Sequence, residues 1–254
     1  MSREASIDYD ACAPGYPAQR QTEPRIAAYI DAALGEARTV VNVGAGAGSY
    51  EPRDRNVIAV EPSAAMRAQR PDHLAPAIDA RAEKLPLDDD STDAAMALIT
   101  IHHWDDPIGG LREMLRVARD RVLVLTFDID VLADFWMITD YLPEALADDR
   151  ERFPAIATIL DTLGAHAAQP VPIPADCVDG FFESHYARPE QYLDRSVREA
   201  QSIWPRLPPG VEQRALGALG ADLQSGAWDR RHGHLRTQAT YEGGLRLISS
   251  RAAA

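Results

Sequence analysis

Lysine is nearly absent from this sequence of 254 residues. Lys84 is the single lysine among 26 basic residues, and the formal net charge is -13. Proteins that bind nucleic acid neutralise phosphates with a stripe of basic side chains, and this sequence contains no such stripe. We therefore expect no nucleic-acid partner.

Cysteine is also scarce, since Cys12 and Cys177 are the two in the sequence. Two thiols this far apart do not form the closely spaced ligand pairs of a metal site, and in a cytosolic chain they are more often reduced than paired. We expect neither a metal site nor a disulfide.

Long apolar runs are missing as well. The opening segment MSREASIDYDACAPGYP has no apolar core of signal-peptide length, and no stretch approaches the roughly 20 apolar residues that a membrane span needs. We expect a cytoplasmic protein with no membrane partner. The length suits one domain with a sizeable core.

The first half of the sequence alternates between apolar runs and helical segments. Residues 24–34 open with proline and space three aliphatic side chains along one helical face, and residues 109–118 also predict a helix. Such alternation is typical of a parallel sheet buried on both faces, and it predicts a doubly wound α/β fold. The predicted strands lie in residues 39–44, 56–63, 93–104 and 121–128.

Beyond residue 130 the pattern changes. A proline-rich stretch leads into a predicted strand at 177–186, and the last apolar run lies at 243–250. Two late strands that flank a polar, helical insertion from about 188 to 238 predict an antiparallel hairpin at the end of the sheet. Within the insertion, residues 188–204 predict an amphipathic helix.

Three glycines follow the first predicted strand, in VVNVGAGAGSYE at residues 40–51. The spacing is G-x-G-x-G, one position shorter than the dinucleotide fingerprint G-x-G-x-x-G. Glu61 ends the second strand, where a carboxylate can accept both hydroxyl protons of a ribose. Because ligands of open α/β sheets bind at the first βα turn, the pattern predicts a nucleotide-like ligand. A tight turn without a ligand and a helix-start carboxylate are the alternatives.

Four segments taken in order resemble the motifs of class I S-adenosylmethionine-dependent methyltransferases, in particular the group that includes the ubiquinone and menaquinone biosynthesis methyltransferases. They are VVNVGAGAGSYE, VIAVEPSAAM, DARAEKLPLDDDSTDAAMALITIHHWDDP and LREMLRVA, within residues 38–128. The resemblance implies a mostly parallel seven-stranded sheet whose seventh strand runs antiparallel between the fifth and the sixth. It also implies a single domain over 1–254, with an N-terminal lid and helix (1–37), a cofactor-binding core (38–128) and a substrate side (129–254).

The resemblance further implies which residues hold S-adenosylmethionine. The glycine turn would lie along the methionine part of the cofactor, Glu61 would hold the ribose hydroxyls, and Tyr16 would belong to a segment that folds over the site. Most relatives carry Asp or Glu where Asn42 stands, so another carboxylate has to compensate or the affinity is lower. The cofactor-binding residues carried over are Tyr16, Gly44, Ala45, Gly46, Glu61, Pro62, Met66, Ala82, Glu83, Thr100 and Ile101.

Methyl transfer from a sulfonium is an in-line displacement, so positioning of the acceptor is the main task of the enzyme. If the acceptor is a hydroxyl or an acidic carbon, a neutral histidine can assist as a base, and His103 and His102 are the candidates. Neighbouring residues of a strand point to opposite faces, so we expect at most one of them to face the acceptor. The alternative is that both histidines shape the site. Six aromatic residues either wall an acceptor site or belong to the core: Trp136, Tyr141, Phe181, Phe182, His185 and Tyr186.

The leading prediction is methyl transfer from S-adenosylmethionine to a small organic acceptor, by a monomer or a homodimer. A catalytically silent S-adenosylmethionine-binding protein and an enzyme that uses this cofactor for another reaction remain alternatives. An NAD(P)-dependent oxidoreductase would share the first strand and Glu61, but it does not account for the AEKLPL and HHWDD motifs. The acceptor itself is not encoded by any recognisable pattern in residues 130–240.

Overall fold

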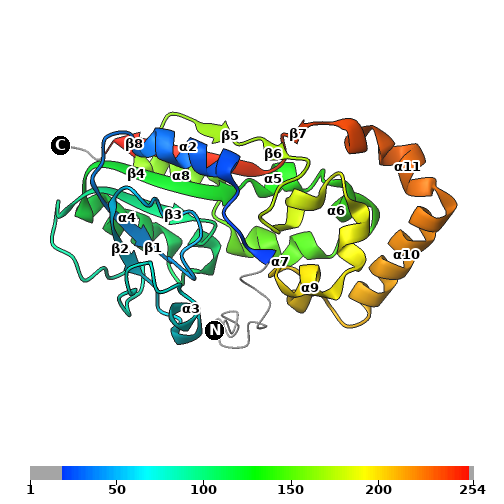
Figure 1. The fold of residues 1–254 in the computed structure, drawn as a ribbon, viewed down its shortest axis with the longest axis horizontal. Coiled ribbons are helices and arrows are strands. Elements are labelled where there is room, and N and C mark those ends of the chain that lie inside the picture. The colour runs from blue at the N-terminus through cyan, green and yellow to red at the C-terminus, as the bar shows by residue number, and fades with distance from the viewer. Residues whose placement is uncertain (1–18, 252–254) are drawn as a thin grey trace.

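The computed structural model describes residues 19–251, and its centre is a six-stranded sheet (Figure 1). Four strands in the order β2-β1-β3-β4 run parallel, and β8 pairs antiparallel with both β4 and β5. The strands of this sheet are β1 (Thr39–Val43), β2 (Asn56–Val60), β3 (Thr92–Leu98), β4 (Ala118–Phe127), β5 (Ala168–Pro170) and β8 (Leu245–Arg251).

Successive residues of the parallel strands enter two hydrophobic cores, one on each face of the sheet. Val40 and Met96 belong to one core, whereas their neighbours Val41 and Ala95 belong to the other. All four side chains are fully buried. Burial of both faces explains why these strands are continuous apolar runs and do not alternate with polar residues.

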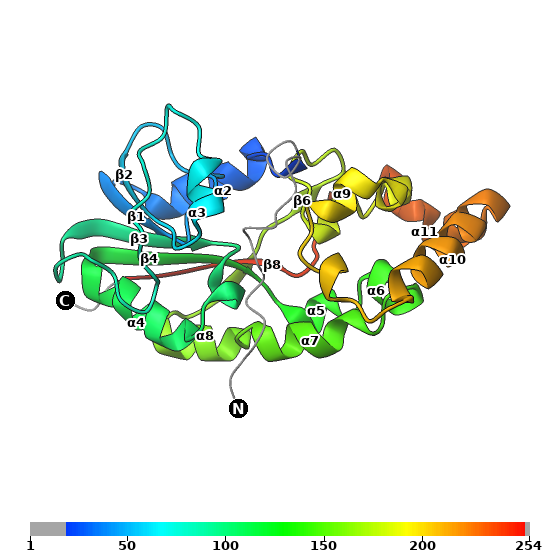
Figure 2. The same ribbon diagram turned by 90° about the horizontal axis from the view of Figure 1, so that it is seen from below.

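Helices cover both faces, which confirms the doubly wound α/β class. In Figure 2, α2 (Pro24–Leu34) lies on one side of the sheet, and α4 (Pro107–Val117) and α8 (Ile156–Leu163) lie on the other. α2 has the predicted bounds, and the Glu23 side chain caps it by accepting a hydrogen bond from the backbone N–H of Arg25.

The predicted count of seven strands is not met in the described chain. Ile78 forms one isolated parallel bridge with Val60 beside β2, where a further edge strand would begin. Pro76, two residues before Ile78, lacks the N–H group that a longer ladder requires on this side of the bridge.

The strand predicted at 177–186 is wrong, because this segment contains the 3-10 helix η3 (Phe182–His185). The outer partner of β8 is instead β5, a short strand that precedes the proline-rich stretch. β8 nevertheless lies antiparallel between β4 and β5, as the resemblance implied. A separate two-stranded sheet, β6 (Ile173–Pro174) with β7 (Thr240–Tyr241), joins the two ends of the insertion.

The insertion between β5 and β8 is helical, as predicted, but the single amphipathic helix expected at 188–204 is wrong. Pro189, the capping side chain of Asp194 and Pro205 each start a new short helix in this region. The remaining helices of the described chain are α3 (Ala64–Ala68), η2 (Ile101–His103), α5 (Ile129–Leu132), α6 (Trp136–Asp140), α7 (Ala145–Arg152), η4 (Pro189–Leu193), α9 (Arg195–Glu199), η5 (Trp204–Arg206), α10 (Val211–Ser225), α11 (Ala227–His232) and η6 (Gly233–Thr237).

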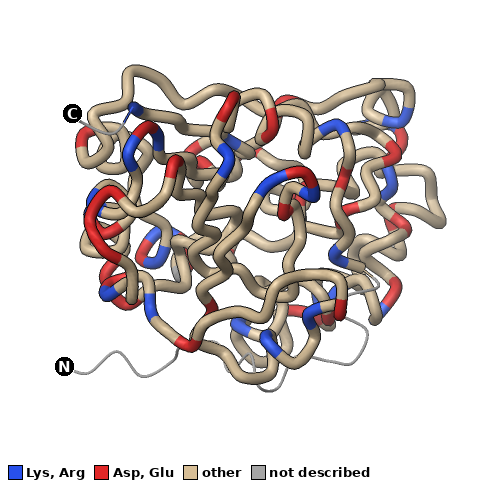
Figure 3. Tube along the Cα trace, turned by 60° about the vertical axis from the view of Figure 1, so that its left-hand side comes forward, with Lys and Arg blue, Asp and Glu red and all other residues tan. Residues whose placement is uncertain are grey.

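Acidic and basic side chains are interspersed along the described trace (Figure 3). None of the helices in residues 19–251 has the length and apolar character needed to cross a bilayer. Cys177 is a buried free thiol, and Cys12 lies outside the described residues.

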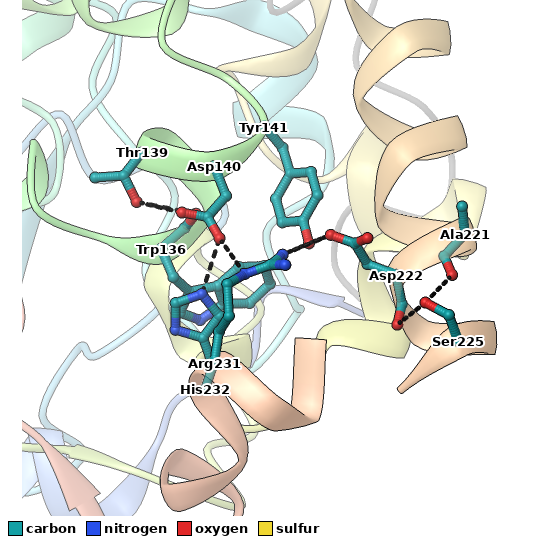
Figure 4. Close-up of polar contacts among 9 residues, drawn as sticks. All are labelled: Trp136, Thr139, Asp140, Tyr141, Ala221, Asp222, Ser225, Arg231 and His232. Atoms are coloured by element: carbon teal, nitrogen blue, oxygen red, sulfur yellow. Dashed lines mark hydrogen bonds and ion pairs between the residues drawn. The ribbon is translucent and has the colours of Figure 1, made fainter. Parts of the chain in front are cut away.

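A polar network fastens α10 and α11 to α6 (Figure 4). Asp140 Oδ2 accepts hydrogen bonds from Arg231 Nε at 3.1 Å and from His232 Nε2 at 2.9 Å. The Tyr141 hydroxyl donates to Asp222 Oδ2 at 2.8 Å, and Arg231 pairs with the same carboxylate. One guanidinium therefore joins an α6 carboxylate to an α10 carboxylate, and the network fixes the outer end of the insertion.

This network predicts acid-sensitive docking of α11. Burial raises the pKa of the Asp140 carboxyl, but the hydrogen bonds from His232 and Thr139 outweigh burial and lower it. A carboxyl with a lowered pKa stabilises the fold above its unfolded pKa of about 4, and the contribution is lost as the pH falls further. We expect Asp140→Asn to lower the free energy of unfolding by about 1 kcal/mol at pH 7, and the difference from wild type to shrink near pH 3.

Urea unfolding at both pH values measures this difference. Glu199→Gln, which removes an exposed helical pair with Arg195, is the matched control and should change stability by less than about 0.5 kcal/mol. An Asp140→Asn protein as stable as wild type at pH 7 would contradict the assignment.

Candidate functional site

A cavity of about 1300 Å³ opens at the carboxyl ends of the parallel strands. The segments that follow β1, β2, β3 and β4 line one side of it, and residues 181–183, 199–203, 205 and 206 of the insertion line the other. Ligands of open α/β sheets bind at this edge, so the cavity lies where the fold places a site.

The glycine turn brings the backbone against the neighbouring strand end. Gly44 has a φ of +71°, and a Cβ at this position would lie 2.2 Å from Thr100 Oγ1. The N–H groups of Gly44 and Ala45 both donate to the Val60 carbonyl oxygen, at 2.9 and 3.0 Å. Glycine is therefore required at position 44 by both conformation and space.

Glu61 is tied to this turn. Its Oε2 accepts a hydrogen bond from Gly46 N–H at 2.8 Å and its Oε1 accepts one from Ser63 N–H at 2.9 Å. Ser63 in turn caps α3, because its side chain accepts a hydrogen bond from Met66 N–H. An ionised carboxylate has about four acceptor positions, so Glu61 retains capacity for two hydroxyl donors from a ligand.

Seven of the predicted cofactor-binding residues line the cavity: Gly44, Ala45, Gly46, Glu61, Pro62, Met66 and Thr100. Ala82, Glu83 and Ile101 do not line it. Ala82 packs behind Trp104, and Glu83 accepts a hydrogen bond from Asp106 N–H at 3.0 Å. Asp79 and Arg81, which the sequence analysis did not single out, line the cavity in their place. Tyr16 lies outside the described residues.

Asn42 lies beneath the glycine turn and is 2% exposed. Its Nδ2 donates to Glu51 Oε1 at 3.0 Å, and Glu51 Oε2 forms an ion pair with Arg70 Nη2 at 2.9 Å. Within residues 19–251 its Oδ1 has no hydrogen-bond partner. Asn42 and Glu51 both line the cavity, so a carboxylate lies beside position 42, contributed by a residue nine positions later.

His102 and His103 both line the cavity, and the strand predicted at 93–104 ends at Leu98, so the argument that neighbouring residues of a strand point to opposite faces does not apply to them. They lie in the 3-10 helix η2, whose period of three residues does not send neighbours to opposite faces. Their ring centroids are 3.8 Å apart, and the His102 ring stacks on Phe153 with a centroid distance of 4.1 Å.

Both imidazoles are neutral at neutral pH. Burial and the nearby Arg152 guanidinium hold the pKa of His103 well below its usual range, and burial with the same group does so for His102. Arg152 Nη2 lies 3.0 Å from His103 Nδ1. A guanidinium only donates, so this contact places the His103 proton on Nε2.

Aromatic and aliphatic side chains line part of the cavity, beside polar residues of the insertion such as Gln201, Ser202 and Arg206. Phe181 and Phe182 line it, as one of the two interpretations predicted, whereas Trp136, Tyr141, His185 and Tyr186 lie in the core, as the other predicted. Three further lining side chains that the sequence analysis missed are Phe127, Leu132 and Phe153.

Glu183 is a fully buried carboxyl group in this wall. Both of its oxygens lie within 3.0 Å of a single donor, the N–H of Gly244. Burial raises the pKa of Glu183 to about 7, against the opposing effects of Gly244 and Arg246. A Cβ on Gly243 would lie 2.2 Å from Glu183 Oε1, so the turn before β8 is built around this carboxyl group.

The raised pKa predicts that the fold loses stability as the pH rises. The folded protein holds a proton that the unfolded chain releases near the ordinary pKa of 4.5, so the free energy of unfolding falls between about pH 4.5 and 7. Glu183→Gln should remove this dependence and be more stable than wild type at pH 8 by up to about 3 kcal/mol. Parallel pH profiles of unfolding for the two proteins would contradict the prediction.

Comparison with known proteins shows that the chain is similar to methyltransferases. Residues 41–126 match a family described as a methyltransferase domain. An uncharacterized methyltransferase of Mycobacterium tuberculosis is 34% identical over 126 residues, which are 46% of this chain and 50% of that protein. The chain thus spans about half the length of the curated relatives it matches.

Two solved structures extend the likeness over nearly the whole chain. A putative methyltransferase from an antibiotic biosynthesis pathway of Anabaena variabilis is 30% identical, with a TM-score of 0.83 over 92% of this chain and 99% of that one. A methyltransferase of Thermotoga maritima that depends on S-adenosylmethionine, described as a possible histamine N-methyltransferase, shares the fold. It is 17% identical, with a TM-score of 0.53 over 91% of this chain and 88% of that one.

Proposed function

The chain belongs to the class I S-adenosylmethionine-dependent methyltransferases, and we propose that it transfers a methyl group from S-adenosylmethionine to a small organic acceptor. The observation that carries the proposal is the continuous cavity that joins the glycine turn and Glu61 to an aromatic chamber containing two neutral histidines. We call the part at the glycine turn and Glu61 the first half of the cavity and the aromatic chamber the second half. A transferase needs both, because the donor and the acceptor have to meet in one space.

The residues of the first half suit this cofactor. Glu61 has acceptor capacity left for ribose hydroxyls, and Pro62 and Met66 offer adaptable apolar surface for an adenine. The Oδ1 of Asn42, without a partner in the described chain, suits a donor such as an ammonium group. When bound, the cofactor supplies a methyl group on a positively charged sulfur.

The residues of the second half suit an acceptor with an apolar or aromatic body. Phe127, Phe153, Phe181 and Phe182 provide flat apolar walls that also exclude water. The resemblance to the ubiquinone and menaquinone group is consistent with such a body and is retained as a proposal, as are the cytoplasmic location and a monomeric or homodimeric state.

The two histidines have different roles in this proposal. His103 carries its proton on Nε2 and acts as a hydrogen-bond donor, held in that tautomer by Arg152. His102 lines the cavity and is the candidate base; its Nδ1 is buried without a hydrogen-bond partner in the described chain, so the proton would pass to its other ring nitrogen, Nε2. Both stay neutral at neutral pH because their pKa values are low.

Calorimetric titration with S-adenosylmethionine, S-adenosylhomocysteine and NAD tests the cofactor. We expect both sulfur ligands to bind and NAD not to bind. Incubation with radiolabelled S-adenosylmethionine and a panel of apolar phenols, acids and amines then tests transfer. Binding of NAD alone would overturn the proposal, and binding without transfer to any acceptor would favour the catalytically silent alternative.

Removal of the Glu61 carboxylate should weaken cofactor binding. Glu61→Ala removes a charge-assisted contact to two hydroxyls, and we expect the Kd for S-adenosylhomocysteine to rise at least tenfold, or about 1.4 kcal/mol. Glu144→Gln, which alters an exposed pair with Arg214, is the control and should leave the Kd unchanged. An unchanged Kd for Glu61→Ala, in a protein that remains folded, would show that the ribose assignment is wrong.

The histidine assignment predicts a flat pH profile. Because the pKa of each imidazole lies well below its usual range, kcat should not fall from histidine protonation between pH 8 and 6. His102→Ala and His103→Ala should each lower kcat at least tenfold while the Kd for S-adenosylhomocysteine changes less than threefold. Full turnover by either variant would remove that histidine from the catalytic assignment.

A further inference from the structure

We propose that Glu51 and Arg70 are cofactor-positioning residues: they fix the amide of Asn42, a residue that lines the cavity, so that its buried and unpartnered oxygen accepts a hydrogen bond from the ammonium group of S-adenosylmethionine. The inference rests on the proposed function and names side chains that act at the amino-acid end of the cofactor. It is carried by the contacts of three residues whose side chains are buried.

The three side chains form one chain of contacts. Asn42 Nδ2 donates to Glu51 Oε1 at 3.0 Å, and Arg70 Nη2 donates to Glu51 Oε2 at 2.9 Å. The Glu51 side chain is 1% exposed and the Arg70 side chain 4% exposed. A buried ion pair of this kind is held in one geometry, so the position of the amide is held as well.

The chemistry of the groups decides which way the amide points. A carboxylate paired with a guanidinium only accepts hydrogen bonds, so Glu51 has to face the amide nitrogen of Asn42. The amide oxygen is then directed elsewhere, and within the described chain it has no partner. A buried acceptor without a donor is unfavourable, and an N–H donor of a ligand would satisfy it.

Arg70 also holds the glycine turn. Its Nη1 donates to the Gly46 carbonyl oxygen at 3.2 Å, and its Nε and Nη2 donate to the Ala75 carbonyl oxygen at 3.1 and 2.9 Å. Gly46 is the residue whose N–H binds Glu61. The Arg70 guanidinium therefore fixes the position of the glycine turn directly and that of the Asn42 amide through Glu51.

The charges of the trio are balanced as they stand. The carboxylate of Glu51 and the guanidinium of Arg70 neutralise each other, and Asn42 adds an uncharged amide hydrogen-bonded to Glu51. An aspartate at position 42 would place two carboxylates within hydrogen-bond distance of each other with one guanidinium to share, which is unfavourable. The amide is thus the group that the Glu51–Arg70 pair requires at this position.

Two ligands separate the amino-acid end of the cofactor from the rest of it. S-adenosylhomocysteine carries the amino acid, and 5′-methylthioadenosine has the same nucleoside and sulfur without it. We expect Glu51→Gln to raise the Kd for S-adenosylhomocysteine at least tenfold and to leave the Kd for 5′-methylthioadenosine within twofold of wild type. Glu61→Ala, at the ribose end, should weaken both ligands and is the matched control.

A charge exchange tests the positioning role directly. Asn42→Asp alone should lower the thermal stability of the ligand-free protein and should not tighten the binding of S-adenosylhomocysteine. The double variant Asn42→Asp, Glu51→Gln restores one carboxylate and one guanidinium. The new amide at position 51 then donates to the new carboxylate at position 42 and accepts from Arg70, so we expect the Kd to return to within threefold of wild type.

Three results would overturn the inference. The first is an equal rise in the Kd of both ligands in Glu51→Gln. The second is a lower Kd for S-adenosylhomocysteine in Asn42→Asp alone, and the third is a double variant that binds this ligand no better than Glu51→Gln. Wild-type protein that binds neither ligand would instead overturn the proposed function. Thermal unfolding of each ligand-free variant shows whether a loss of binding reflects a loss of folding.

Discussion

The close approach of the Gly44 backbone to Thr100 is the constraint on which the site depends. β1 and β3 are neighbours, and the chain leaving β1 passes directly over the end of β3. Because position 44 has no Cβ, the turn can bend back and donate two N–H groups to the end of β2. The N–H of Gly46 then donates a hydrogen bond to Glu61, and Arg70 donates one to the Gly46 carbonyl oxygen. The cavity edge is therefore a backbone turn held by backbone bonds to Val60 and by the side chains of Glu61 and Arg70, which is rigid support for a ligand.

The parallel strands and α2 can be predicted from the sequence. β-branched runs buried on both faces identify the parallel strands, and proline with a regular aliphatic spacing identifies α2, because these signals depend on neighbours in the chain. The segment 177–186 has the same apolar composition as a strand but folds into a 3-10 helix within the insertion. Its conformation is set by packing against distant residues, for example by the bond between Glu183 and Gly244, and no local pattern encodes that contact.

The same distinction applies to the site. Gly44 and Glu61 could be found from the sequence because they occupy fixed places relative to predicted strands. Glu51 and Arg70 could not, since one lies in a turn and the other in an irregular segment, and only the fold brings them to Asn42. The oddity of an asparagine in the first strand was a usable signal that a carboxylate had to come from elsewhere. The aromatic chamber gave no such signal, because its members come from β4, the loop before α8 and the insertion.

The position of β8 has a consequence for the order in which the molecule assembles. β8 is the last strand in the sequence, yet it lies inside the sheet between β4 and β5. Until it is in place, β5 has no partner in the sheet and the edge of β4 is open. β5 and β8 hold the two ends of the insertion at this edge of the sheet, so the insertion wall of the cavity depends on the pairing of β8. During synthesis the segments that carry the glycine turn and Glu61 emerge before the segments that supply Phe181 and Phe182.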